Sequence, residues 1–581
     1  MHEQTRTRPP ELVPVLLVSF LSLLTFGVQY VSRRLDDNRL TSWQWLFPHT
    51  HPAVIAALIA AGCAAAYLAA RSSFPDRRPM AFLLLLSYGT GVLFWSEPEV
   101  LVDTARYFTQ AKHLELYGVP YFLREWGRAV PAWTDLPLLP FLYGLLFSVF
   151  GESRIWIQAF TTALFSLTVA STYLLGRTLW DEDTGFIGGL LLLGMPYLFT
   201  QVPLMLVDVG TMCFFTLAVL AVVLALRRGD RCSLAGAVSA VTLALLAKYS
   251  TWMLLSVLGV VFVVQWFSSW RRDEGSGAGP EPRTVLIRTG IIAVGTALLT
   301  GAVLFFFRDV VAEQFRLLLE YQRPGFARWS EGMVSTFFFQ VHPLISAAAL
   351  YSLIAAVRKR DPRYLIIGWT VLLLLALRIE RIRYLLTVFP MLALMAAYGI
   401  REIDGRSLRR FVVFCVVAGS VSVAAAAYLP FLRTVSLVNL REAGAYLDST
   451  GAGSVEVETL PDARHLLDRR VYVPILDLYT KASIRYRPPR ETAPSRDVIN
   501  VSSLRFTWEL RDPGYYAGPD TGGEQPRVIA VISSFPDQEL TSEVKKKVRG
   551  YRRGRTFGTD EGVYQSKTFV TIYEKAFDEN K

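Results

Sequence analysis

The sequence is poor in charged residues and in cysteine. Only 19% of its 581 residues are Asp, Glu, Lys or Arg, whereas 52% are hydrophobic, and the mean hydropathy is +0.34. Soluble domains carry about 25% charged residues and do not place apolar residues in repeated blocks of about 20. The few cysteines lie in or beside apolar blocks: Cys63, Cys213, Cys232 and Cys415. We therefore expect a membrane protein whose polar segments have no disulfide framework.

The motifs of several common enzyme classes are also missing. The chain has no HExxH, no paired CxxC, no P-loop and no GxSxG. Zinc-protease, nucleotide-driven and serine-hydrolase functions therefore lack support. The net charge is +11, but the basic residues stand between apolar blocks rather than along one stripe, so we expect no nucleic-acid partner. The first apolar block has no small-residue cleavage site and is long enough to span, which predicts a retained helix.

Apolar blocks long enough to cross about 30 Å of hydrocarbon recur along the chain. We expect about thirteen spanning helices, at Leu12–Val31, Val54–Ala70, Met80–Trp95, Ile155–Leu179, Phe186–Val202, Val209–Leu226, Leu234–Ala247, Tyr249–Trp266, Val285–Phe307, Ser335–Val357, Tyr364–Leu377, Tyr384–Ala397 and Phe411–Leu429. Short arginine-rich loops between them belong on the cytoplasmic side, near residues 71–78, 227–231, 271–283, 358–363 and 401–410. A single inside–outside alternation of the spans places all of these loops in the cytoplasm. It predicts a multi-pass plasma-membrane protein with a cytoplasmic N-terminus and an extracytoplasmic C-terminal tail.

One apolar block, Pro137–Phe150, is too short for a span at 1.5 Å per residue. If it crossed, every later basic loop would lie outside, so we expect it at the outer interface. The outer regions are then residues 96–154, residues 308–334 and the tail.

The tail is expected to form a small α/β domain. Strands are expected at Val455–Glu458, Val528–Ser533 and Thr568–Tyr573, helices at Leu440–Leu447 and Ser542–Tyr551, and a long loop at Arg487–Gly523. The expected organisation is two extra N-terminal helices in residues 1–79, a core in 80–430 with outer loop 96–154, and an outer domain in 431–581.

A carboxylate in the first outer loop is a candidate catalytic group. Asp103 follows Glu97 and Glu99, and Tyr107 lies one helical turn further along the same face. A carboxylate just above the membrane, beside a tyrosine, suits a general base near a lipid head group. The alternative is an exposed interfacial helix whose acids are merely solvated.

Asp208 and Lys248 are charged residues at the edges of apolar blocks. Asp208 has no Lys or Arg within several residues, so when buried it needs a proton, a metal or a partner from another helix. The alternative role is the N-cap of the helix that starts at Val209. Lys248 falls between two spans at the expected outer surface, where it either snorkels to water or meets a phosphate.

The outer segment Arg378–Tyr384 contains three arginines, against the positive-inside preference. An anionic ligand is expected to compensate them, because the planar donors of arginine suit phosphate oxygens. A salt bridge of Glu380 would account for only one of the three. We therefore favour Arg381 and Arg383 as phosphate-binding residues.

The order of these features resembles the GT-C superfamily of membrane glycosyltransferases. Within it, the chain is similar to the branch of protein O-mannosyltransferases and lipid A aminoarabinose transferase (glycosyltransferase family 39-like). The matching segments are Asp103-Thr-Ala-Arg-Tyr107, Asp135–Tyr143 leading into Phe150–Arg154, Tyr173–Arg177, Val207-Asp208, Leu246-Ala-Lys248 and Arg383–Pro390. The resemblance covers residues 80–397 and extends more loosely to an outer C-terminal domain.

The resemblance implies roles for several residues. Asp103 would be the catalytic carboxylate that activates the acceptor, and Asp208 the second acidic group of the same cavity. The donor phosphate would lie near Lys248, Arg383 and Tyr384, to which the charge argument adds Arg381. The acceptor side of the cavity would include Glu99, Tyr107 and Asp135.

Two positions depart from the pattern of the family. Many relatives have Asp-Glu where this chain has Asp103-Thr104. The basic residue or histidine that often precedes a Pro-Pro pair in this loop is absent, because this chain has Asp135-Leu136-Pro137 there. Donor or acceptor preference is therefore left open, and so is a divalent cation, for which Asp103 and Asp208 would be the candidate ligands.

The expected function is an inverting transfer of a hexosyl or pentosyl group from a polyprenyl-phosphate donor, on the outer face. The acceptor is left open among protein, lipid and polysaccharide. The alternatives are a transporter or flippase of lipid-linked sugars, and a polymerase or ligase of surface polysaccharide. Transporters often show inverted repeats, and none is evident here.

Overall fold

The computed structural model describes residues 12–72, 74–100, 102–270, 280–322, 331–435, 437–461, 467–488, 507–508, 512–517, 526–559 and 568–575. The chain forms two compact units. The first, here the helical unit, comprises Met1–Trp95, Gln158–Pro203 and Val207–Phe431. The second, here the mixed unit, comprises Ser96–Ile157, Leu204–Leu206 and Leu432–Lys581. Most of the expected loop Arg487–Gly523 lies outside the described residues.

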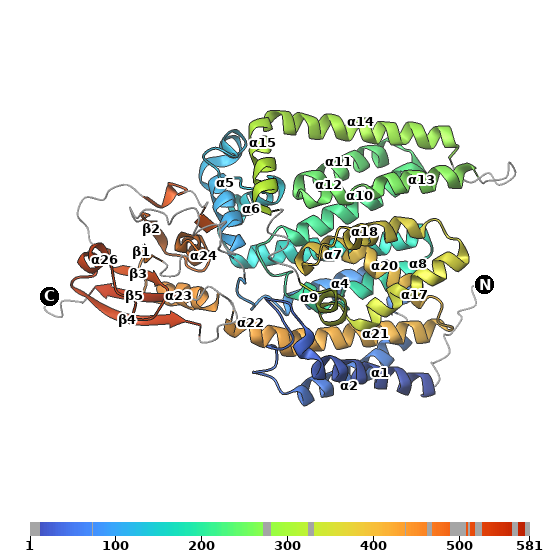
Figure 1. Cartoon of the computed structure of the whole chain (residues 1–581), viewed down its shortest axis with the longest axis horizontal. Helices are drawn as coiled ribbons and strands as arrows, with labels where there is room; N and C mark the ends of the chain where they lie inside the picture. The colour runs from blue at the N-terminus through green and yellow to red at the C-terminus, as the bar shows by residue number, and fades with distance from the viewer. Residues whose placement is uncertain are drawn as a thin grey trace. The chain divides into compact units, whose positions relative to one another are not determined.

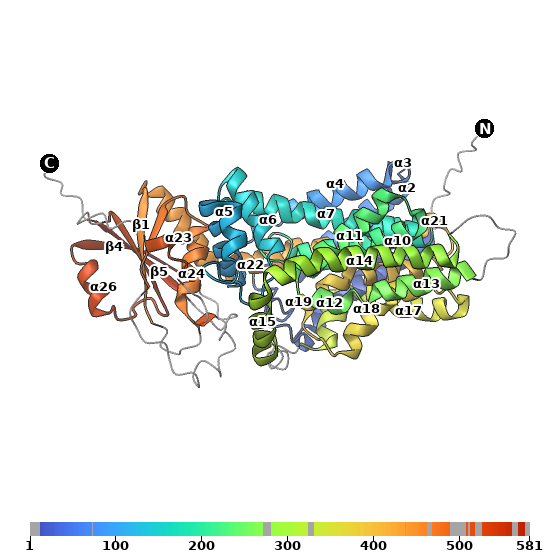
Figure 2. The same cartoon turned by 90° about the horizontal axis from the view of Figure 1, so that it is seen from above.

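The helical unit is a bundle of helices (Figure 1). Its elements are α1 Leu12–Val31, η1 Arg33–Leu35, α2 Pro52–Arg71, α3 Phe74–Arg77, α4 Pro79–Val92, α7 Arg154–Leu179, α8 Glu182–Leu192, α9 Pro196–Phe199, α10 Asp208–Arg228, α11 Arg231–Ala247, α12 Ser250–Leu254, α13 Val257–Trp270, α14 Pro282–Phe306, α15 Arg308–Leu317, η2 Leu318–Gln322, η3 Ser335–Gln340, α17 Pro343–Lys359, α18 Tyr364–Ala376, α19 Ile382–Leu385, η4 Leu386–Val388, α20 Phe389–Ile400, α21 Arg406–Val423 and η5 Ala424–Tyr428. The first residues of α7, up to Ile157, and the last residues of α22 Leu429–Val435, from Leu432, belong to the mixed unit. Helix α17 packs against α20, α10 against α11, and α2 against α21. Figure 2 shows α14 running beside α13 and α10.

Several of these helices match the apolar blocks of the sequence. In the described residues, eight helices are long and apolar enough to cross a membrane: Leu12–Val31, Pro52–Arg71, Arg154–Leu179, Asp208–Arg228, Ser250–Trp270, Pro282–Phe306, Ile382–Ile400 and Arg406–Val435. Four shorter apolar helices accompany them: Pro79–Val92, Leu138–Phe150, Arg231–Ala247 and Tyr364–Ala376. The predicted class, a polytopic α-helical membrane protein with a C-terminal α/β part, is confirmed, whereas the count of about thirteen spans stays a prediction.

Proline breaks two of the expected spans. The block expected to run from Phe186 to Val202 is divided into α8 and α9, because Met195 before Pro196 has an extended backbone. The block Ser335–Val357 is likewise divided at His342-Pro343, where His342 caps α17 by accepting a hydrogen bond from the backbone N–H of Leu344. Each break produces a short helix where the sequence predicted a continuous one.

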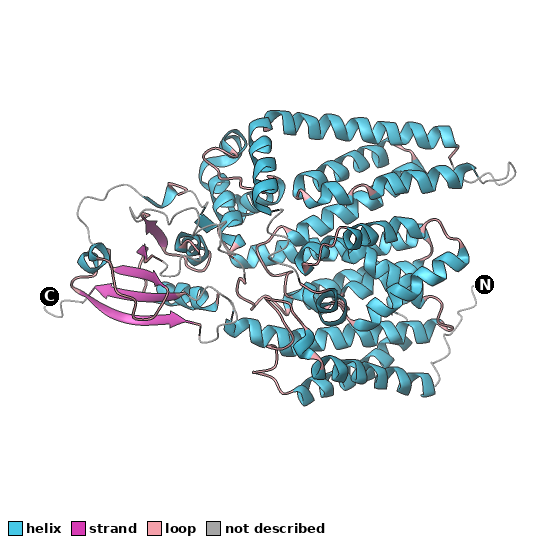
Figure 3. Ribbon diagram, in the orientation of Figure 1, coloured by secondary structure: helices cyan, strands magenta, loops and turns pink. Residues whose placement is uncertain are grey.

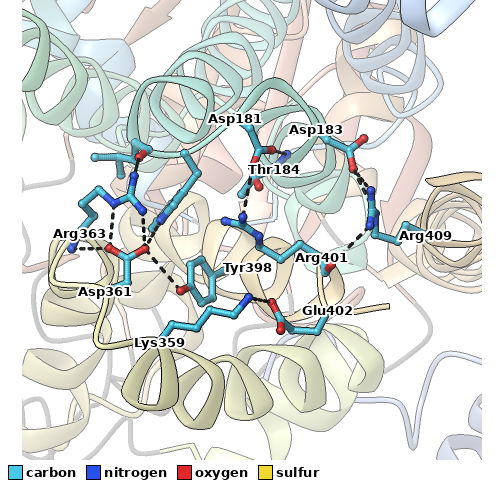
Figure 4. Close-up of polar contacts among 12 residues, drawn as sticks. Asp181, Asp183, Thr184, Lys359, Asp361, Arg363, Tyr398, Arg401, Glu402 and Arg409 are labelled. Carbon is cyan, nitrogen blue, oxygen red and sulfur yellow. Dashed lines mark hydrogen bonds and ion pairs between the residues drawn. The ribbon is translucent and has the colours of Figure 1, made fainter. Parts of the chain in front are cut away.

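Charged side chains join the helix ends where two of the arginine-rich loops meet (Figure 4). Asp361 accepts hydrogen bonds from Trp180 Nε1 at 2.8 Å and from Arg363 Nε at 2.8 Å. Asp183 at the start of α8 pairs with Arg409 of α21 at 2.9 Å. The turn between α7 and α8 is therefore bonded to both the 358–363 loop and the 401–410 loop, so these basic loops lie at one end of the helical unit.

The mixed unit combines the first predicted outer loop with the tail. It contains α5 Asp103–Glu125, α6 Leu138–Phe150, α23 Val438–Ser449, β1 Ser454–Thr459, η6 Arg469–Val471, α24 Tyr472–Asp477, β2 Ser483–Tyr486, η8 Tyr515–Ala517, β3 Val528–Ser533, α26 Ser542–Lys547, β4 Tyr551–Gly558 and β5 Phe569–Lys575. The strands, magenta in Figure 3, form one sheet in the order β2-β1-β3-β5-β4. Strands β2, β1 and β3 are parallel, and β5 pairs antiparallel with both β3 and β4.

The start of α5 belongs to the same hydrophobic core as the sheet. Val102 and Ala105 are buried in one cluster with Leu440 and Leu447 of α23 and with Val455 of β1. Val102 and Ala105 lie on either side of Asp103, so the tail supports the turn that carries this carboxylate.

The edge of the sheet differs from the prediction. The helix expected over Ser542–Tyr551 ends at Lys547, and β4 begins at Tyr551. Gly550, with φ of 89°, makes the turn between them in a backbone region that side chains disfavour. Strand β4 is exposed over Arg552–Arg555, so it lacks the alternation by which sequence patterns reveal strands. The four-residue strand β2 also escaped prediction.

Candidate active site

Asp208, Lys248 and Arg383 meet in the helical unit. Lys248 Nζ lies 2.6 Å from Asp208 Oδ1, and Arg383 Nε donates to Asp208 Oδ2 at 2.8 Å. The Asp208 and Arg383 side chains are only 3% and 6% exposed, whereas Lys248 is 23% exposed. The partners that the buried carboxylate was expected to need are therefore these two cations. Asp208 is the first residue of α10 after the N-cap Val207, so it is not itself the cap.

Helix α10 separates this cluster from the basic loops. At its other end, Arg227 donates a hydrogen bond to the carbonyl oxygen of Thr178, near the turn between α7 and α8. The 21 residues of α10 extend about 30 Å, the thickness of a hydrocarbon core. The cluster of Asp208, Lys248 and Arg383 therefore lies at the end of the helical unit opposite to the arginine-rich loops.

Tyr384 provides an aromatic face between two cations. Lys248 Nζ lies 5.1 Å from the centre of its ring, and the guanidinium carbon of Arg381 lies 5.3 Å away. Cation–π contacts of this kind are attractive within about 6 Å. The four predicted donor-side residues, Lys248, Arg381, Arg383 and Tyr384, are thus brought together, with Lys248 and Tyr384 partly open to solvent.

Sequence reasoning missed one acid beside this cluster. Glu331 is 3% exposed, and its Oε2 accepts a hydrogen bond from the backbone N–H of Ile382 at 3.0 Å. Burial raises the pKa of Glu331 to about 6, although Ile382 N–H and Arg381 counteract it. Glu331 lies in a long polar segment, where no apolar context marks a single acid as unusual. Glu380, which the sequence suggested as a salt-bridge partner of one of the three arginines, forms no ion pair within the described residues.

Asp103 belongs to a second charged cluster, in the mixed unit. Arg106 lies 3.6 Å from Asp103 and 3.2 Å from Asp135, and its guanidinium carbon is 5.5 Å from the ring centre of Tyr107. Gln110 Nε2 donates to Asp135 at 3.3 Å. Three of the predicted residues, Asp103, Tyr107 and Asp135, therefore share one neighbour, Arg106. The sequence motif contained Arg106, but its spacing alone assigned it no role.

Glu99 is fully buried and is held by several donors. Its carboxylate accepts hydrogen bonds from Thr104 Oγ1 at 2.8 Å and from the backbone N–H of Met205 at 3.1 Å, and it pairs with Arg154 at 3.2 Å. The Glu99 backbone N–H donates to Tyr479 Oη at 2.6 Å. Glu99 thus joins all three chain segments of the mixed unit. The sequence predicted Glu99 only as part of an acceptor cavity and did not predict this structural role.

A buried lysine links α5 to the tail. Lys112 Nζ lies 2.5 Å from Asp477 and 3.0 Å from Glu152, and Tyr516 Oη donates to the same Asp477 oxygen at 2.8 Å. Burial opposes the charge of Lys112, but the two carboxylates outweigh it and raise its pKa. Burial raises the pKa of Glu152 to about 7.

Among the described residues, no group of three His, Cys, Asp or Glu side chains is placed to hold a metal ion. The described residues therefore provide no set of ligands for the divalent cation considered near Asp103 or Asp208.

Known proteins resemble this chain in part of its sequence and in most of its fold. A family model described as dolichyl-phosphate-mannose-protein mannosyltransferase matches residues 131–274, which include Asp135, Asp208 and Lys248. Among solved structures, ArnT from Cupriavidus metallidurans bound to undecaprenyl phosphate superposes with a TM-score of 0.55 at 13% identity, covering 86% of this chain and 98% of that chain. This chain has the GT-C fold.

The same ArnT in its apo state gives a TM-score of 0.53 at 13% identity, with 85% of this chain and 97% of that chain covered. No curated protein matches the sequence significantly. The GT-C fold that the sequence motifs predicted is therefore confirmed, with resemblance to the mannosyltransferase and aminoarabinose transferase branch.

Proposed function

We propose that this chain is a glycosyltransferase that moves a hexosyl or pentosyl group from a polyprenyl-phosphate donor to an acceptor hydroxyl, with inversion at the anomeric carbon. The GT-C fold supports this function, and the similar ArnT structure contains undecaprenyl phosphate. The observation that carries the proposal is the buried cluster of Asp208, Lys248 and Arg383 at the end of an apolar helix, because charges there are costly and mark functional sites.

The charges of this cluster suit a phosphate. Lys248, Arg381 and Arg383 supply three positive charges, which Asp208 and Glu331 balance only in part when both are ionised. A phosphodiester donor carries one negative charge, and the polyprenyl phosphate that leaves carries more. Fixed cations therefore stabilise the leaving group as its charge develops, which is often the largest electrostatic contribution to catalysis.

The chemical step is a single displacement at the anomeric carbon. The acceptor oxygen forms a bond to the anomeric carbon while the bond from that carbon to the phosphate oxygen breaks and its electron pair stays on the phosphate. Asp103 takes the acceptor proton as general base, and the guanidinium of Arg106 lies 3.6 Å from its carboxylate. Asp103 receives this role from its place in the motif that resembles the family.

We place the reaction on the outer face of the plasma membrane, with the N-terminus in the cytoplasm and the tail outside. The arginine-rich loops at the opposite end of α10 support this orientation, because such loops stay in the cytoplasm.

The direct test is sugar transfer by Asp103→Asn in membranes supplied with a radiolabelled polyprenyl-phosphate sugar. We expect turnover to fall at least about 100-fold, because an amide cannot take the proton. Asp309→Asn is the matched control, since Asp309 is a carboxylate with an 87% exposed side chain on α15, and it should keep wild-type turnover.

Wild-type turnover by Asp103→Asn would overturn its assignment as the base. Comparison of cell-envelope glycans between a deletion strain and its parent would identify the sugar and the acceptor together. An unchanged glycan profile with altered lipid-linked sugar distribution across the membrane would instead support a flippase.

A further inference from the structure

The loop between α1 and α2, here the α1–α2 loop, is bonded to the segment of residues 331–341. Asp36 in this loop is 1% exposed. Its carboxylate accepts hydrogen bonds from Ser335 Oγ at 2.5 Å and from Gln340 Nε2 at 2.9 Å. It also accepts from the backbone N–H groups of Asn38 and Trp43 in its own loop. One carboxylate therefore joins two segments that lie about 300 positions apart.

Further contacts reinforce this junction along the whole segment. Asp37 accepts from the backbone N–H of Gly332 at 2.7 Å, and Trp43 Nε1 donates to the carbonyl oxygen of Phe339 at 3.1 Å. Gln340 Nε2 donates to the carbonyl oxygen of Thr41 at 3.2 Å, and its Oε1 accepts from Tyr428 Oη at 2.8 Å. Both ends of the segment, at Gly332 and at Gln340, are thus fixed by the α1–α2 loop.

Glu331 connects the same segment to the phosphate-binding residues. Glu331 Oε2 accepts the backbone N–H of Ile382, the first residue of α19. The next residue is Arg383, which donates to Asp208. Hydrogen bonds therefore join Asp36 to Ser335 and Gln340 of the segment, and Glu331, at the start of the same segment, to α19.

The burial of both acids shows that the junction is tightly packed. Burial raises the pKa of Asp36 to about 6, opposed by its hydrogen bonds to Ser335, Trp43, Asn38 and Gln340, and it raises the pKa of Glu331 to about 6. Burying a carboxylate is costly unless it is hydrogen-bonded.

We propose that the α1–α2 loop is a positioning element of the donor-phosphate site: Asp36 fixes segment 331–341, and Glu331 at its start holds α19 so that Arg383 and Tyr384 face the phosphate. The assignment of the ligand rests on the proposed function, whereas the positioning of α19 rests on the contacts alone. Asp36 and Glu331 are positioning residues, since they act through Arg383.

The first test compares Glu331→Ala with Glu331→Gln in the full chain. Alanine removes the acceptor for Ile382 N–H, whereas glutamine keeps a carbonyl oxygen at the same place. We expect Glu331→Ala to raise the KM for the polyprenyl-phosphate sugar roughly 10- to 100-fold, because small misplacement of charged groups is costly. Glu331→Gln should restore most of the affinity, and kcat should change less than KM.

Asp36→Asn tests, in the same assay, the contact of the α1–α2 loop with segment 331–341. It should raise KM in the same direction, and the double variant with Glu331→Ala should show less than the product of the two effects, since both act through one element. Asp183→Asn is the control, because it removes an ion pair at the opposite end of the helical unit. It should lower the thermal midpoint in detergent without changing KM.

Hydrogen exchange provides a readout that needs no substrate. Backbone amides of Ile382–Val388 should exchange faster in both Asp36→Asn and Glu331→Ala, and at the wild-type rate in Asp183→Asn. Unchanged exchange in the first two variants, or equal KM for Glu331→Ala and wild type, would overturn the inference.

Binding of polyprenyl phosphate separates this inference from the proposed function. If the wild type binds this lipid and Arg383→Gln abolishes binding while Glu331→Ala does not weaken it, the positioning role is wrong and the proposed function stands. If the wild type does not bind the lipid at all, the proposed function fails, and the donor-phosphate part of this inference fails with it.

Discussion

Asp208 is held by two cations that come from distant parts of the chain. Lys248 and Arg383 both contact its carboxylate, at 2.6 Å and 2.8 Å. Removing one partner of a buried ion pair costs about 3–5 kcal/mol, because it leaves a charge uncompensated. Substitutions that preserve charge therefore report on geometry better than deletions do, and the fork of an arginine differs from the point charge of a lysine.

Arg383→Lys is expected to lower kcat/KM for the sugar donor by roughly 10- to 100-fold, because lysine keeps the charge but cannot bridge Asp208 and a phosphate with a planar fork. Arg378→Lys is the matched control in the same short segment, where Arg378 is exposed. Sugar-transfer kinetics on both variants measure the difference. Equal losses in the two would show that only the net charge of the segment matters.

Glu152 gives the mixed unit a pH-dependent stability. Burial raises its folded-state pKa to about 7 from 4.5, so its contribution to stability is complete below about pH 4.5 and is lost as the pH rises through about 7. From about pH 5 to about pH 8, the thermal midpoint of the wild type should therefore fall by a few degrees more than that of Glu152→Gln. Glu539→Gln, which alters an exposed carboxylate, should keep the wild-type slope. Parallel curves for wild type and Glu152→Gln would contradict the prediction.

Some site residues could be predicted from the sequence because their surroundings are unusual. Asp208 and Lys248 are charges at the edges of apolar blocks, and Arg383 is one of three arginines in the expected outer segment Arg378–Tyr384. Glu331 and Arg106 could not be predicted in this way. An acid in a long polar segment, or a basic residue near two acids, is ordinary in sequence and becomes informative only through its contacts.

At the scale of elements, α5 and the tail depend on each other. The hydrophobic residues beside Asp103 lie in the core of the tail, and Lys112 of α5 pairs with Asp477 at the end of α24. The sequence predicted helical spacing after Asp103 and, from short β-rich runs, three of the five strands. It did not predict this association, because a hydrophobic face does not specify its partner. Strand β4 was missed since its exposed arginines resemble a solvated helix end.

Lys112→Ala should destabilise the mixed unit by about 3–5 kcal/mol, because it leaves Asp477 buried without its cation. Lys545→Ala, which breaks an exposed pair with Glu539, should leave the stability of the mixed unit almost unchanged, because exposed ion pairs contribute little. Limited proteolysis of the purified protein, followed with an antibody against the tail, measures both. Equal resistance of the two variants would show that the Lys112 pair does not support the tail.

At the scale of the whole molecule, we predict that the end of the helical unit with the arginine-rich loops faces the cytoplasm. The GT-C fold fixes the order of helices but not which end faces the cytoplasm. The chain offers a natural probe, because Cys232 is exposed near the basic loop at 227–231, whereas the other three cysteines are buried.

A membrane-impermeant maleimide should not label Cys232 in intact spheroplasts but should label it in inverted vesicles. Asp537→Cys, at a tail position whose side chain is 82% exposed, should show the opposite pattern. Labelling is read by mass shift on a gel. Modification of Cys232 from outside would reverse the proposed orientation and place the site of Asp208 in the cytoplasm.

The mixed unit is built from Ser96–Ile157, Leu204–Leu206 and Leu432–Lys581, which has a consequence for biosynthesis. The segment that contains Asp103 is made early, but the strands that complete its core are translated last. At about 5–20 residues per second, the early segment, complete at Ile157, waits roughly 20–85 s for the last strand, which ends at Lys575. During that interval its apolar residues are open to proteases and chaperones, so a nonsense mutation just before β5 (Phe569–Lys575) should inactivate the protein as fully as one just before Asp103.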